Sequence, residues 1–198
     1  MTDRGYTTQK KIEDYLGGGT ISASLSIYIL SAQKFIEDYC QRVFKADSVA
    51  TARLFDGRGS NSLRIDDCVE ITKVEVGNDE FGDSFTEETD LTKVKQLPNN
   101  AIVLGLPITE LYNRNKEFIV GLQNHKITAK WGFSDCVPAD VSFVATVLAS
   151  GMYKNAQGAG AVKSESIGAY SVSYDNLQNW SDFKSINLVL DNYKRYGL

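Results

Sequence analysis

The spacing of apolar residues changes twice along the chain, from a helical period to an alternating one and back. Between Ser22 and Phe44 apolar side chains recur every three or four residues, which places them on one face of a helix. From 49 to 132 the period falls to two, as in half-buried strands. Helical spacing returns in Pro138–Lys154 and Ser181–Tyr196. The pattern predicts an α+β protein.

The helical segments carry their own start and stop signals. A short helix over Thr7–Leu16 has Thr7 or Thr8 to cap its first turn and Gly17 to end it. Pro138 suits the first position of the helix that follows it. That helix also has apolar residues off its main stripe, such as Phe143 and Val147, so we expect it to be buried nearly all round. The residues 156–174 read as a long glycine-rich loop with one extended segment.

The alternating region predicts several short strands joined by turns. Thr51–Phe55 and Ser62–Ile65 flank Asp56-Gly57-Arg58-Gly59, which is typical of a hairpin. Further strands are expected at Cys68–Val76, Ala101–Leu104, Phe118–Val120 and Lys126–Trp131, with turns at 77–79, 97–100 and 121–124. Short strands at this spacing favour a small sandwich or barrel. The predicted organisation is a core of three to four helices, 1–48 with 133–198, and a β-rich insertion over 49–132.

Composition narrows the class of protein. The 198 residues carry a net charge of -4, and a general nucleic-acid binder needs clustered positive charge instead. Cys40, Cys68 and Cys136 lie far apart in sequence and read as reduced thiols. The start of the chain lacks the apolar stretch of a signal peptide, and no apolar run is long enough to span a bilayer. We expect a soluble intracellular protein with no membrane partner.

Few residues could support catalysis or bind a metal. A Ser or Cys nucleophile needs an adjacent base, and His125 is the single histidine. The cysteines lack zinc-ligand spacing, and the acidic stretch Asn78–Asp90 fails the register of a calcium loop. The glycine-rich stretches lack the context of a phosphate-binding loop. We therefore predict no enzyme activity, no cofactor and no metal, and interpret His125 as structural.

Aromatic residues are abundant, with ten Tyr, nine Phe and two Trp. Several lie in or near the late loop and the C-terminus, among them Tyr170, Tyr174 and Tyr193. Stacking on single-stranded nucleic acid would require interleaved basic residues, which occur only at Lys194 and Arg195. Because Tyr, Trp and Arg are enriched at protein interfaces, these residues favour protein–protein contact.

The order of motifs resembles that of head–tail connector (adaptor) proteins of tailed bacteriophages, in particular the longer members with a β insertion. The resemblance rests on Ile127-Thr128-Ala129-Lys130-Trp131-Gly132-Phe133, on Val137-Pro138-Ala139-Asp140-Val141 opening an Ala/Val-rich helix, and on the run from Val162 to Tyr174. Upstream, Leu54-Phe55-Asp56-Gly57 and Leu63-Arg64-Ile65-Asp66-Asp67 after the long helix are also similar. Residues 78–116 have no counterpart in it.

The resemblance implies a structural virion protein, made in the cytoplasm of a bacterial host and placed in the neck between capsid portal and tail. It implies a ring of about twelve subunits under the portal, which extends the DNA channel, lets double-stranded DNA pass without specific binding, and docks the stopper or tail. Alternatives are a tail-completion or stopper protein and a β-sandwich ligand-binding module.

Two groups of residues are candidate contacts within such an assembly. The aromatic and basic C-terminal segment is a candidate portal-binding site through Tyr193, Lys194, Arg195, Tyr196 and Leu198. The extended part of the late loop is a candidate contact with a neighbouring subunit or the stopper through Ile167, Tyr170, Val172 and Tyr174.

Overall fold

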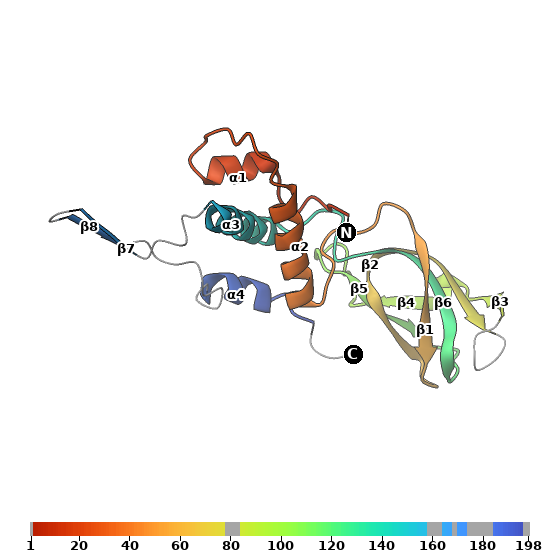
Figure 1. Ribbon diagram of the computed structural model, residues 1–198. Coiled ribbons are helices and arrows are strands. Elements are labelled where there is room, and N and C mark those ends of the chain that lie inside the picture. Colours follow the sequence, from red (N-terminus) through yellow and green to blue (C-terminus); the bar gives the residue numbers. More distant parts are fainter. Residues whose placement is uncertain (1, 78–83, 158–163, 168–169, 174–183, 196–198) are drawn as a thin grey trace. The chain divides into compact units, whose positions relative to one another are not determined.

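The computed structural model describes residues 2–77, 84–157, 164–167, 170–173 and 184–195 (Figure 1). The chain divides into two compact units. The helical unit comprises Met1–Arg42 and Val137–Leu198, and the β unit comprises Val43–Cys136. The mixed α+β class predicted from the sequence is confirmed.

The helical unit contains four helices: α1 (Gln9–Tyr15), α2 (Ser26–Cys40), α3 (Ala139–Ala156) and α4 (Lys184–Asp191). The Thr8 hydroxyl accepts a hydrogen bond from the Lys11 backbone N–H and caps α1, as expected. Pro138 lies just before the first turn of α3. None of the helices in the described residues is long and apolar enough to cross a membrane.

The helices predicted at Ser22–Phe44 and Ser181–Tyr196 are longer than the observed α2 and α4. The residues 22–25 are not helical, and the Ser24 hydroxyl accepts from the Ser26 backbone N–H, a local bond that competes with helix formation. At the other end Gln41 adopts a left-handed conformation with φ of 54° and closes α2. After α4, the residues 192–195 leave the helix, and the Arg195 backbone N–H donates to the Cys40 carbonyl instead.

Within the helical unit α2 packs against α3 and α4, while α1 packs against α3. Apolar side chains fill the space between them, and the largest fully buried ones include Ile12, Ile36, Leu148 and Leu190. The contact between α1 and α3 is more polar: the hydroxyls of Thr7 and Thr146 are 2.7 Å apart. α3 is buried nearly all round, as predicted: from Val141 to Gly151 every residue is buried or half-buried apart from Phe143, which is mostly exposed.

The β unit is one antiparallel sheet of six strands: β1 (Thr51–Gly57), β2 (Ser62–Gly77), β3 (Phe85–Glu88), β4 (Val94–Leu97), β5 (Ile108–Asn113) and β6 (Gly121–Trp131). The order is β1-β6-β2-β5-β4, and β3 pairs with β2. β2 is sixteen residues long and irregular. Its first part pairs with β5 and its second with β6, so that Cys68 lies opposite both Ile108 and Trp131.

The predicted hairpin between the first two strands does not form. β1 pairs with β6, with Thr51 opposite Ala129 and Phe55 opposite His125. The reason is burial: Ile127, Ala129 and Trp131 on β6 are fully or almost fully buried. A strand with that many buried side chains belongs in the centre of a sheet, so β6 separates β1 from β2.

Three further predictions in this region are wrong. The residues 101–104 form turns closed by the bond from the Leu104 N–H to the Asn100 carbonyl, since an apolar run without alternation is no evidence of a strand. The residues 118–120 make a single bridge, Ser60 to Phe118, instead of a ladder. The segment 121–124 opens β6 and is not a turn, while β3, β4 and β5 were not expected at all.

The inner side of this sheet buries one apolar cluster, which includes Leu63, Ile65, Ile108, Leu111, Ile127 and Trp131. The strands form a single sheet, with β1 and β4 at the ends of its order among the described residues. The predicted sandwich or barrel is therefore not confirmed.

Candidate interaction surfaces

The described part of the predicted portal-binding segment, residues 193–195, contacts other residues of the helical unit. The Tyr193 hydroxyl donates to the Asp140 carboxylate at 2.9 and 3.1 Å, and the Lys194 ammonium lies 4.8 Å from the ring centre of Tyr39. Burial, reinforced by Asp140, raises the pKa of Tyr193 to about 12. Tyr196 and Leu198 lie outside the described residues. Portal binding by this segment stays a prediction.

The extended part of the late loop is a two-stranded hairpin of β7 (Ser164–Ile167) and β8 (Tyr170–Ser173). Ile167 pairs with Tyr170, and Glu165 pairs with Val172. Among the described strands β7 and β8 pair with each other alone. Tyr174 lies outside the described residues. An isolated hairpin of this size is marginal in water, so a further partner would stabilise it.

His125 is not positioned as a catalytic base. It is fully buried in β6 rather than in a turn, and burial lowers its pKa. Burial also raises the pKa of the Cys40 thiol to about 11 and that of Cys68 to about 12, which disfavours the thiolate. Among the described residues no three His, Cys, Asp or Glu side chains gather as metal ligands would.

The β unit presents an exposed apolar segment at the start of β6. We define the 119–122 ridge as the residues Ile119, Val120, Gly121 and Leu122, whose three large side chains are exposed. The hydrophobic pattern does not indicate this ridge, because it predicts a strand over Phe118–Val120 and a turn after it.

Two fully buried polar side chains hold the ridge. The Ile119 carbonyl accepts hydrogen bonds from Asn124 Nδ2 at 3.1 Å and from His125 Nε2 at 3.2 Å. The Asn124 amide oxygen in turn accepts from the Gly57 backbone N–H at 3.0 Å. A carbonyl only accepts, so Nε2 carries the imidazole hydrogen, and Nδ1 is buried without a hydrogen-bond partner. This arrangement, the Asn124–His125 anchor, joins the ridge to β1.

Gly57 completes the anchor because it leaves room for the ridge. A Cβ atom at this position would lie 1.7 Å from the Ile119 carbonyl oxygen and 2.5 Å from His125 Nε2. Real Cβ atoms do not approach a backbone oxygen so closely, so a glycine is needed here for steric reasons.

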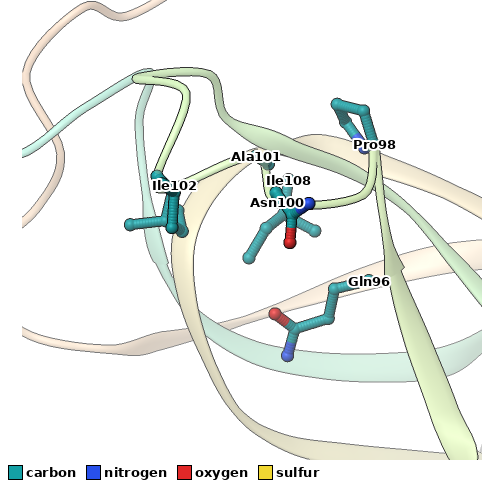
Figure 2. Close-up of a pocket in the computed structure, with 7 residues that line it drawn as sticks. Gln96, Pro98, Asn100, Ala101, Ile102 and Ile108 are labelled. Carbon is teal, nitrogen blue, oxygen red and sulfur yellow. The ribbon is translucent and has the colours of Figure 1, made fainter.

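A second apolar segment follows β4. In this 101–106 loop the side chains of Ile102, Val103, Leu104 and Leu106 are exposed, and Ala101 is buried. Figure 2 shows the small hollow beneath it, about 150 Å³ in volume, between Gln96, Pro98, Asn100 and Ile108. Pockets for cofactors or drug-sized ligands are typically larger, at about 300 Å³ or more. The hollow therefore gives no support to a small-molecule site.

The helical unit has an exposed aromatic pair of its own. The rings of Tyr15 on α1 and Phe143 on α3 meet edge to face, with centroids 6.2 Å apart and planes at 77°. Both side chains are largely exposed. Such pairs occur often in protein interfaces, where they contribute large contact areas at low entropic cost.

Comparison of the sequence with protein-family models and with curated proteins finds no match. Comparison of the fold with solved structures does. A chain from the neck of an empty gene transfer agent particle, computed with C6 symmetry, superposes with a TM-score of 0.59 at 12% identity. A chain from the neck of the native particle, computed with C12 symmetry, gives 0.58 at 12%, and one from the native virion gives 0.60 at 10%. Each match covers 100% of this chain and 94% of the other. The two units of this chain thus share their fold with a chain from the neck of such a particle.

Proposed function

We propose that this chain is a structural protein of the neck of a tailed, phage-like particle. The observation that carries the proposal is the fold match to chains of a particle neck, which covers this chain from end to end. The order of sequence motifs supports it independently, because that order resembles phage head–tail connectors. The exposed apolar segments of both units are typical of surfaces that bind other proteins.

In its finer form the proposal assigns the chain to the adaptor ring beneath the portal. About twelve copies close a ring, which extends the DNA channel and docks the stopper or tail. Neck structures computed with C6 and C12 symmetry support a closed ring. The net charge of -4 suits a channel through which double-stranded DNA passes without specific binding, because like charges repel. The helical unit forms the ring wall, and the protein acts as no enzyme.

Native mass spectrometry of the protein, alone and mixed with the portal protein of the same particle, tests the proposal. Twelve copies of the 21.9 kDa chain give a ring of about 263 kDa. A ring of this order, free or bound to the portal, is the expected result. A monomer that ignores the portal overturns the proposal.

The same mixture tests the C-terminal contact. A chain shortened by residues 196–198 leaves the described contacts of Tyr193, Lys194 and Arg195 intact, so the helical unit keeps its fold. Loss of portal binding with an intact ring is expected if the C-terminus docks there. A second variant is shortened in the same way and also has Lys194 and Arg195 replaced by serine. The contact is overturned if both variants bind the portal as well as the full chain does.

A further inference from the structure

We propose that one copy of this chain binds the next through two unlike faces of the helical unit. The Phe143 face consists of Phe143 and Val147 on α3 with Tyr15 on α1. The Ile27 face consists of Ile27 and Leu30 on α2. The partner is a second copy of this chain, and the inference rests on the ring proposed above.

Helix geometry places the two faces on separate sides of the helical unit. Successive residues of an α-helix are about 100° apart, so Ile27 lies roughly 160° from the buried stripe of α2, which includes Ile29, Ala32 and Ile36. Phe143 lies roughly 150° from the stripe of Val144, Ala145 and Leu148 on α3. Because α2 and α3 pack on each other, each side chain points away from their shared core.

Exposure sets these residues apart from the rest of their helices. Phe143 is 61% exposed and Ile27 is 66% exposed, although every other phenylalanine, leucine or isoleucine described on α2 and α3 is buried or half-buried. Val147 lies four residues after Phe143, and Leu30 lies three residues after Ile27. Both side chains are half-buried. Tyr15 meets Phe143 edge to face and extends the aromatic surface onto α1. Together they form two small apolar surfaces on α1, α2 and α3, in addition to the exposed Leu188 on α4.

Two unlike faces fit a head-to-tail contact. A two-fold dimer needs one self-complementary patch, whereas a ring repeats a contact between two different patches around the axis. The fold is shared with chains of particle necks computed with C6 and C12 symmetry, which are rotational arrangements of this kind. The Phe143 face of one copy therefore packs against the Ile27 face of the next.

Two single variants of the full chain test the contact under the conditions in which the wild type assembles. Phe143→Ser disables the first face and Ile27→Ser the second, and each variant is expected to lose the ring and remain a monomer. Since both side chains are exposed, their melting temperatures should match the wild type. The control variants Val103→Ser and Leu122→Ser remove apolar side chains of similar or greater exposure from the β unit and should still form rings.

An equimolar mixture of the two variants decides between a head-to-tail contact and any other. Each variant keeps one working face, so the mixture forms one contact and stops at a dimer of about 44 kDa, twice the 21.9 kDa chain. Rings formed by either single variant overturn the inference while the proposed function stands, as does a mixture that stays monomeric. A wild type that forms no ring overturns both. Native mass spectrometry separates these masses.

Discussion

Two segments of the β unit expose large apolar side chains, the 119–122 ridge and the 101–106 loop, and they are held in different ways. The ridge is tied to its strands by the buried side chains of Asn124 and His125 and by close contact with Gly57. The loop is closed by backbone hydrogen bonds of its own turns, such as that from the Leu106 N–H to the Ala101 carbonyl.

The difference has a consequence for binding. A surface that is fixed before a partner arrives loses little conformational entropy on binding. The ridge is fixed by buried side chains from outside it, whereas the loop is fixed by its own backbone, so the ridge depends on the Asn124–His125 anchor and the loop does not. Three predictions test how far the Asn124–His125 anchor accounts for this difference, in order of decreasing effect.

The largest effect is expected from Gly57→Ala. The added methyl group would overlap the Ile119 carbonyl, so the ridge must move and the Asn124–His125 anchor must break. We expect the free energy of unfolding of the β unit to fall by about 3 kcal/mol or more, at the upper end for overpacked sites. Urea titration followed by the fluorescence of the buried Trp131, in a Trp180→Phe background, measures the loss.

Gly105→Ala is the matched control in the 101–106 loop. Gly105 has φ of 69°, but a Cβ atom there would meet no other atom within 4 Å. The cost is limited to the backbone conformation, about 1 kcal/mol. Equal losses for the two variants would contradict the contrast between the ridge and the loop.

Asn124→Ala is expected to have the next largest effect. It removes a hydrogen bond from the Ile119 carbonyl and leaves the buried Gly57 N–H without its acceptor. An unsatisfied buried polar group costs about 1–3 kcal/mol. The same titration should show a loss of about 2 kcal/mol, within that range. Asn99→Ala, at an exposed position before the loop, should change stability by less than about 0.5 kcal/mol.

The sequence predicted the helices well and the β unit poorly, for a physical reason. Helices such as α2 and α3 are set by spacing within one segment, so Ile29, Ala32 and Ile36 alone indicate a buried face. Strand partners depend on residues far away. β6 lies between β1 and β2, and its buried residues Ile127 and Ala129 pair with residues of both neighbouring strands. No local pattern encodes this pairing.

The candidate contacts were harder still to predict. Aromatic and basic density led to Tyr193 and Lys194, although both side chains contact the helical unit itself. The Phe143 face was missed because an apolar residue on a strongly apolar helix reads as core. The Asn124–His125 anchor was missed because its partners are a glycine and a carbonyl from distant segments. Exposure and backbone contacts of this kind become visible only in the folded chain.

The smallest effect, and the sharpest probe of the Asn124–His125 anchor, is its dependence on pH. His125 donates through Nε2, and a second proton would have to enter at Nδ1, which is buried without a hydrogen-bond partner. Burial accordingly lowers its pKa below the ordinary 6.5. The unfolded chain takes up the proton first as the pH falls below about 6.5, so stability is complete above that value and declines beneath it. The slope of the free energy of unfolding with pH is at most about 1.4 kcal/mol per pH unit.

Urea titrations between pH 7.5 and 5 should show this decline in the wild type and not in His125→Gln, because His125 is the single histidine of the chain. A pH-independent wild type would mean that His125 accepts the second proton at Nδ1 in place, with the Nε2 hydrogen bond to the Ile119 carbonyl intact.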